Sequence, residues 1–397
     1  MAMSPWLQDL REQLPVTRQW VYMNTGSSGP VPEPALAAMD QAARALSAAG
    51  PGREATVRES EARLEAIRQD LGRFLGCSAE RLCYTQNTSD GIAKVVAGLS
   101  WRPGDEVITS ELEHGSGLLP FAYLRDRFGV RVRLLRPRDG ARLTPDELRE
   151  ALTPRTRLIC MSHVSYATGA RQPVEAAAEM ARGHGALLLV DGAQSAGVLP
   201  LELETLGADA YAVPGQKWLL GPEGTGVLYI SPRAQEHVAP TSIAWASVEH
   251  GEGPYEPLSY RLKGSAGRYE LATLSLPLLE GLRASVAVLE GIGRRVVWER
   301  VATLTGRLKE GLAARPWVQL ITPAAAELAA GLVTFNLKGW PAPEVVRLLA
   351  ERYRVVGRWV PHPQAVRLSV HVFNTEDEVD QVLRALDELA SERGSGA

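Results

Sequence analysis

Short apolar runs alternate with amphipathic segments between residues 71 and 230, and this alternation limits the possible folds more than any other feature of the chain. Runs of this length, rich in Val, Ile and Leu, indicate buried strands, and several of the intervening segments have helical spacing. Strands that alternate with helices favour an α/β fold with a mostly parallel sheet covered on both faces, and ligands gather at the carboxyl ends of such strands. The predicted strands are 81–85, 106–110, 130–135, 158–162, 186–191, 210–213 and 226–230.

The pattern changes after about residue 231, which indicates a second, smaller α+β domain. A linker leads to predicted helices at 274–288 and 294–314, strands at 318–321, 332–337 and 366–372, and a closing helix at 376–390. Asn374 and Thr375 are both candidate N-caps for that closing helix. A chain of 397 residues exceeds the size of a single core. We therefore expect an N-terminal segment (1–20) that packs on the small domain, a large cofactor-binding domain (21–245), and a linker, long helix and small domain (246–397).

Composition favours small-molecule chemistry. A net charge of −3 with 45% apolar residues is ordinary for a globular protein, and neither a nucleic-acid partner nor a membrane partner is expected. No signal sequence or membrane span is apparent, so we expect a cytoplasmic enzyme. Cys77, Cys83 and Cys160 lack the spacing of metal ligands, so structural burial is expected and a metal site is not.

A lysine and an aspartate after neighbouring predicted strands suggest the chemistry. Lys217 lies before a glycine-rich turn, and Asp191 ends the apolar run that begins at residue 186. A buried amine has its charged form disfavoured and can form a Schiff base with pyridoxal phosphate. A carboxylate at the next strand end can keep the pyridine nitrogen protonated, which makes the ring an electron sink. The alternative is a solvated loop lysine and a helix-capping aspartate.

The sequence VDGAQSAG at 190–197, together with GQKW at 215–218, resembles the class V aminotransferase and cysteine desulfurase family of pyridoxal phosphate enzymes. The resemblance extends from about residue 21 to about residue 389. It implies the fold of type I pyridoxal phosphate-dependent transferases, pyridoxal 5'-phosphate as cofactor, and a homodimer with composite active sites. The branch it suggests contains cysteine or cystine C–S lyases, ergothioneine-pathway sulfoxide lyases and isopenicillin N epimerase-like proteins.

The resemblance also implies a phosphate site. The segment YTQNTSDG at 84–91 ends a strand and opens a helix, where backbone N–H groups and the hydroxyls of Thr88 and Ser89 can bind phosphate. Ordinary helix capping is the alternative for both residues. Thr273 matches the family threonine that reaches the phosphate held by the neighbouring subunit, although it could instead cap the long helix.

Other residues match family positions around the cofactor ring. His114 matches the histidine that stacks on the pyridine ring, so Lys217, Asp191 and His114 form the expected catalytic set. Gln194 is expected to reach the phenolic oxygen. Pro214 and Gln216 replace a serine and a histidine, so one phosphate contact is expected to be lost and Gln216 to serve as an amide donor. Tyr166 stands where the family has an asparagine near the phenolic oxygen, so the role of that asparagine could pass to the Tyr166 hydroxyl or to Thr168.

Substrate binding is expected to depend on arginine. Arg367 matches the family residue that clamps the substrate α-carboxylate, for which a planar guanidinium offers two parallel hydrogen bonds. An exposed strand arginine is the alternative. Arg358 is a candidate second clamp, and the segment NTGSSGP at 24–30, with Asn24 and Ser27, resembles the family segment that lines the substrate side of the pocket.

The type of reaction is the least determined inference. Desulfurases use a persulfide-forming cysteine, which in the most similar group lies between the two arginine segments, and residues 358–367 contain none. We therefore expect an enzyme that acts on an α-amino acid through an external aldimine, by C–S β-elimination from cysteine, cystine or an S-conjugate. Transamination and epimerisation are alternatives, as is a non-catalytic member that uses the pocket only for binding.

Overall fold

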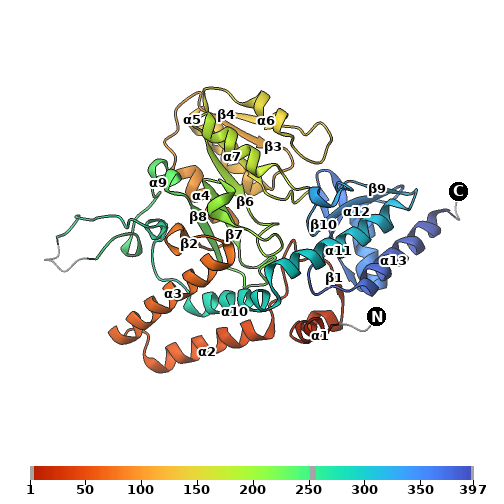
Figure 1. Ribbon diagram of the computed structural model, residues 1–397, viewed down its shortest axis with the longest axis horizontal. Helices are drawn as coiled ribbons and strands as arrows, with labels where there is room; N and C mark the ends of the chain where they lie inside the picture. Colours follow the sequence, from red (N-terminus) through yellow and green to blue (C-terminus); the bar gives the residue numbers. More distant parts are fainter. Residues whose placement is uncertain (1–3, 251–255, 395–397) are drawn as a thin grey trace.

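A seven-stranded sheet with the order β2-β8-β7-β6-β5-β3-β4 forms the centre of the computed structural model, which describes residues 4–250 and 256–394 (Figure 1). Strands β7, β6, β5, β3 and β4 are parallel, and β8 is antiparallel to both of its neighbours. The strands are β2 (Leu82–Thr85), β3 (Glu106–Ser110), β4 (Arg131–Leu135), β5 (Thr156–Ser162), β6 (Leu187–Asp191), β7 (Ala210–Pro214) and β8 (Gly226–Ile230). The predicted sheet is confirmed, with strand ends that differ by at most two residues.

Both faces of this sheet are buried, which explains why its strands are apolar throughout. In β6, Leu188 and Val190 belong to one hydrophobic cluster, while Leu187 and Leu189 belong to another on the opposite face. The first face packs against α3, α7 and α10, and the second against α4 and α5. The helices of this part of the chain are α2 (Glu33–Ala49), α3 (Glu54–Leu75), α4 (Thr88–Gly98), α5 (Leu119–Phe128), α6 (Pro145–Ala151), α7 (Val174–Gly183), α8 (Leu203–Leu206), α9 (Pro232–His237) and α10 (Leu276–Ile292).

A four-stranded antiparallel sheet of order β12-β13-β10-β9 forms the centre of the second part of the structure, which is drawn in blue (Figure 1). The hydrophobic core between this sheet and the helices that follow the long linker contains residues such as Phe335, Leu308 and Leu386. The short strand β1 pairs in parallel with β11 beside it. These elements are β1 (Val21–Tyr22), β9 (Val318–Leu320), β10 (Leu332–Leu337), β11 (Val355–Val356), β12 (Arg358–Pro361), β13 (Gln364–Ser369), α11 (Arg294–Ala313), α12 (Ala342–Tyr353) and α13 (Glu376–Gly394).

Two details of this second part differ from the sequence prediction. The strand expected at 366–372 is β13 and ends at Ser369, because the N–H of His371 donates to Asn374 Oδ1 (2.9 Å) and not to a neighbouring strand. Helix α12 and the short strands β1, β11 and β12 were not predicted. Of the two candidate caps of α13, Thr375 is the one whose Oγ1 accepts from the N–H of Glu378 (3.2 Å).

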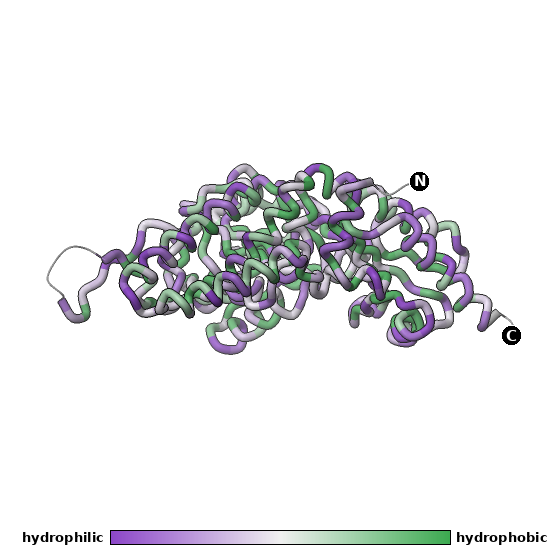
Figure 2. Tube along the Cα trace, turned by 90° about the horizontal axis from the view of Figure 1, so that it is seen from below, coloured by the Kyte–Doolittle hydropathy of each residue, from purple (hydrophilic) through white to green (hydrophobic). Residues whose placement is uncertain are grey.

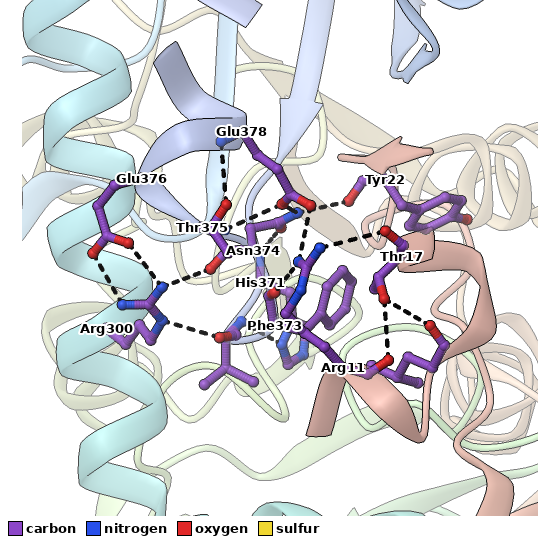
Figure 3. A network of polar contacts seen from close by, with 12 residues as sticks. Arg11, Thr17, Tyr22, Arg300, His371, Phe373, Asn374, Thr375, Glu376 and Glu378 are labelled. Atoms are coloured by element: carbon purple, nitrogen blue, oxygen red, sulfur yellow. Dashed lines mark hydrogen bonds and ion pairs between the residues drawn. The ribbon is translucent and has the colours of Figure 1, made fainter. Parts of the chain in front are cut away.

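The N-terminal helix α1 (Pro5–Glu12) is bound to the turn that precedes α13 (Figure 3). Arg11 donates to the carbonyl oxygen of Phe373 (2.8 Å) and pairs with Glu378 (2.8 Å). On the other side of the turn, Arg300 of α11 donates to the carbonyl oxygen of Asn374 (2.7 Å). Helix α1 and the beginning of α13 are thereby held together. Figure 2 shows hydrophobic segments mainly toward the centre of the molecule and hydrophilic ones mainly at its edges.

Two expectations about organisation and location stay predictions, namely the division at residues 20 and 245 and the cytoplasmic location. Over residues 4–250 and 256–394, no helix is both long enough and apolar enough to cross a bilayer.

Candidate active site

A cavity of about 310 Å³ lies where the carboxyl ends of the central strands face the small antiparallel sheet. Most of the residues expected to form the site line this cavity, although they come from elements far apart in the sequence. They are Ser27, Thr88, Ser89, His114, Asp191, Gln194, Gln216, Lys217, Arg358 and Arg367.

Three of the expected residues lie elsewhere. Asn24 stands behind the wall, where its Oδ1 accepts from Ser27 Oγ (2.8 Å). Thr168 is fully buried outside the cavity, and its hydroxyl donates to the carbonyl oxygen of Ala141 (2.8 Å), so the structure does not support a cofactor contact for it. Thr273 is exposed beside a separate surface depression.

Lys217 and Asp191 follow or end neighbouring parallel strands, which brings them to the same edge of the sheet. Asp191 is the last residue of β6 and is paired with Ala212 of β7, the strand that leads into Lys217. Lys217 lines the cavity, and burial lowers the pKa of its amine to about 8, although Asp191 opposes the change. Burial raises the pKa of Asp191, which Lys217 opposes. The amine is therefore a nucleophile at mildly alkaline pH.

Close packing after Asp191 requires glycine at position 192. A Cβ added there would lie 2.1 Å from the ring of Tyr211 and 2.9 Å from the carbonyl oxygen of Ala212. The backbone can therefore turn tightly, and the N–H of Ala193 donates to Asp191 Oδ1 (2.8 Å). This bond fixes one carboxylate oxygen.

His114 caps a short 3₁₀ helix, and its ring is oriented by neighbours. Its Nδ1 accepts from the N–H of Ser116 (3.2 Å), so the proton of the neutral ring is on Nε2. The ring meets that of Tyr166 edge to face, with centroids 5.2 Å apart. Burial, followed by the charge of Lys217, lowers the pKa of His114, which favours the neutral form. Sequence reasoning missed Ser116.

The beginning of α4 offers polar groups that lack protein partners. Asn87 caps the helix by accepting from the N–H of Asp90 (3.0 Å), so neither Thr88 nor Ser89 is needed as the cap. Among the residues that the structure describes, Thr88 Oγ1 is buried without a partner, as is Gln216 Oε1 on the facing segment. Ser89 Oγ contacts Ser116 Oγ (2.6 Å). A helix N-terminus with unpaired polar groups suits an anion.

Gln194 lies deeper in the wall and is largely committed to the protein. Its amide nitrogen donates to the carbonyl oxygen of Gly26 (3.0 Å), and its oxygen accepts from the indole N–H of Trp218 (2.9 Å). Trp218 follows Lys217 directly, so Gln194 also fixes the segment that carries the lysine. Its expected contact with the phenolic oxygen stays a prediction.

The carboxyl of Glu113 lies close to the cavity, and sequence reasoning missed it. It is 4% exposed and accepts from both the N–H and the hydroxyl of Ser162, a residue of the cavity wall. Burial raises the pKa of Glu113 to about 7, and the charge of Asp191 adds to the effect. A Glu directly before a loop histidine could have suggested it, but its burial depends on tertiary packing.

Glu113 gives a prediction for stability against pH. Its folded-state pKa lies above the ordinary value of 4.5, so the folded state binds the proton more tightly than the unfolded state. The stabilisation is complete below 4.5 and decreases as pH rises to about 7. We expect Glu113→Gln to flatten the pH dependence of the urea unfolding midpoint across this window. An exposed control, Glu223→Gln, should leave the slope unchanged. Equal slopes in Glu113→Gln and the unmodified protein would contradict this role.

A comparison with known proteins identifies the family. The family model for class V aminotransferases matches residues 21–382. The chain belongs to the class V aminotransferase family. It is a pyridoxal phosphate-dependent enzyme with the fold of type I members, and solved structures of the family share its architecture.

Two relatives and one solved structure indicate the range of activities in this part of the class V family. The chain is 30% identical to a probable cysteine desulfurase of Methanothermobacter thermautotrophicus, over 96% of this chain and 98% of the relative. It is 32% identical to isopenicillin N epimerase of Streptomyces clavuligerus, over 99% and 100%. The cystine C–S lyase C-DES, solved with its product cysteine persulfide, superposes with a TM-score of 0.88 at 29% identity, over 94% and 99% of the two chains.

The residues present fit the class V cofactor. One end of the cavity has a helix N-terminus with the unpartnered hydroxyl of Thr88, suited to phosphate. The middle has an amine with a lowered pKa and a buried carboxylate at the next strand end. The far end has Arg358 and Arg367, which suit a substrate carboxylate.

Proposed function

We propose that the protein is a C–S β-lyase that acts on cystine or another cysteine S-conjugate and does not use a persulfide-forming cysteine. The position of the cysteines carries this proposal. Cys77 follows α3, Cys83 is on β2 and Cys160 is on β5, and none of them lines the cavity. Burial raises the pKa of all three thiols, that of Cys77 to about 12, so each is a poor nucleophile.

The chain's own residues divide the work of binding. Thr88, Ser89, Gln216 and the first N–H groups of α4 would hold the cofactor phosphate, His114 would cover one face of its ring, and Asp191 would face the ring nitrogen. Lys217 supplies the amine that carries the cofactor. When bound, pyridoxal phosphate supplies an electron sink that stabilises negative charge on the substrate Cα.

The reaction then needs one proton acceptor and a departing sulfur. Arg367 would orient the substrate carboxylate, and the free amine of Lys217 would remove the Cα proton. The electron pair left on Cα forms a double bond to Cβ while the Cβ–S bond breaks, and the sulfur leaves with that bond's electrons and takes up a proton. The enamine product consumes one water and yields pyruvate and ammonia. The charged groups other than Lys217 do not exchange a proton in these steps, which keeps the reorganisation of the site small.

We further propose a homodimer in which Thr273 of each subunit reaches the phosphate site of the other. The exposed position of Thr273 and of its neighbour Leu271, beside a surface depression, supports this. An isologous two-fold interface is the commonest way to combine such surfaces.

A second candidate is epimerisation or transamination. The 32% identity to isopenicillin N epimerase over almost the whole chain favours it. Both reactions begin with removal of the Cα proton, so the residues assigned above serve them equally.

Product analysis separates these candidates. Purified enzyme is incubated with cystine or S-conjugates of cysteine, and pyruvate, ammonia and the released persulfide or thiol are measured without an added keto acid. We expect pyruvate and ammonia in equal amounts. An obligatory keto acid would indicate transamination, and recovery of the inverted amino acid would indicate epimerisation. A protein that binds the cofactor but turns over no amino acid would favour a binding role.

A further inference from the structure

Two arginines stand directly opposite each other at the edge of the cavity. Arg358 of β12 and Arg367 of β13 are register partners in the antiparallel ladder. Such partners project from the same face of a sheet, and like charges at these positions destabilise the pair. Both side chains line the cavity, so the repulsion is concentrated where a ligand would bind.

No carboxylate compensates this charge. Among the residues that the structure describes, neither arginine takes part in an ion pair, and Asp191 is the one acidic residue of the cavity wall. Asp191 already compensates the positive charge of the Lys217 amine. Burial and the neighbouring Arg358 lower the pKa of Arg367 to about 9, which reflects an uncompensated buried charge.

A single neutral oxygen stands between the two guanidinium groups. Ser27 Oγ accepts from Arg367 Nη2 (3.0 Å) and from Arg358 Nη1 (3.3 Å), while its own proton goes to Asn24 Oδ1. Arg367 Nη1 also donates to the carbonyl oxygen of Tyr166 (3.1 Å), and its buried Nε has no partner within residues 4–250 and 256–394. Several charged donors therefore have no anionic acceptor.

The two arginines differ in burial, which separates their roles. Arg367 is 1% exposed and close to Lys217, whereas Arg358 is exposed at the rim. One carboxylate saturates one guanidinium fork with two parallel hydrogen bonds. The α-carboxylate at Arg367 would leave Arg358 available for a group farther along the substrate.

We propose that Arg358 binds a second anionic group on the substrate side chain, so that the enzyme selects α-amino acids with a side-chain carboxylate. This inference rests on the proposed function and narrows its substrate class to dianionic S-conjugates of cysteine.

The test compares S-carboxymethylcysteine with S-carbamoylmethylcysteine, which have nearly the same shape but differ in one charge. Affinity for the cofactor-loaded enzyme is measured by titration calorimetry, and kcat/KM by pyruvate release. We expect a preference of about 10- to 100-fold for the carboxymethyl compound. Arg358→Gln should reduce this ratio to near one by weakening only that compound. Arg358→Lys should keep part of the preference. The control Arg347→Gln, at an exposed position of α12, should keep all of it.

Each outcome decides the matter. A ratio near one in the unmodified enzyme, or equal weakening of both compounds in Arg358→Gln, overturns the second-anion site and assigns Arg358 to the shared α-carboxylate. A charge preference in the binding measurement without pyruvate release supports the site and refutes the lyase function. The calorimetric measurement therefore separates the two failures.

Discussion

Replacing Lys217 with alanine should reduce turnover by at least about 10⁴-fold, because the variant loses both the amine that carries the cofactor and the group that removes the Cα proton. The fold should survive, since the change removes a cation whose burial already lowers its pKa. The measurements are steady-state pyruvate release and borohydride reduction followed by mass analysis, which should find cofactor fixed to Lys217 only in the unmodified enzyme.

Two variants make this result specific. Lys217→Arg keeps a positive charge but cannot act as a nucleophile, so it should be as inactive as the alanine variant. Lys338→Ala removes an exposed lysine that donates to the carbonyl oxygen of Pro316, and it should keep full turnover. Cofactor fixed to another lysine, or turnover retained in Lys217→Arg, would refute the assignment.

Replacing Arg367 with alanine should raise KM for the amino acid by about 10- to 100-fold, the effect of losing hydrogen bonds to a charged group. Retention of cofactor should change little, because the arginine comes from β13 of the small sheet, whereas Thr88 and Ser89 begin α4. Substrate affinity is measured by steady-state kinetics and cofactor retention by visible absorbance after dialysis.

Arg367→Lys separates charge from geometry in this experiment. Lysine restores a positive charge but not two parallel hydrogen bonds, so only part of the affinity should return. Equal loss of substrate binding and cofactor binding in Arg367→Ala would show that the residue has a structural role. In that role it would donate to the carbonyl oxygen of Tyr166 and to Ser27 Oγ.

The central sheet could be predicted because its strands are buried on both faces. A strand such as β6 has no polar face, so its apolar run marks its position directly. Strand β12 begins with two exposed residues, Arg358 and Trp359, and carries no such signal. The end of β13 depends on a side chain, Asn374, that removes a backbone donor from the ladder, and local pattern does not reveal this.

The placement of Lys217 and Asp191 at one edge of the sheet could be predicted, because both follow strand ends and match family positions. Prediction failed where tertiary contacts decide. Thr168 has the right neighbours in sequence, but its hydroxyl is taken by Ala141 across the wall. The raised pKa of Glu113 comes from burial beneath Ser162, which no spacing of residues encodes.

The contact between Arg11 and the turn at Phe373 joins residues that are 362 positions apart, and β1 likewise needs β11 as its partner. During synthesis on the ribosome, the first segment must therefore wait, unpaired, until nearly the entire polypeptide has emerged. Long-range closure of this kind slows folding and leaves early segments open to misassembly. A nascent chain of this protein should accordingly depend on chaperones while this early segment lacks its partners, as β2 also does until β8 has been made.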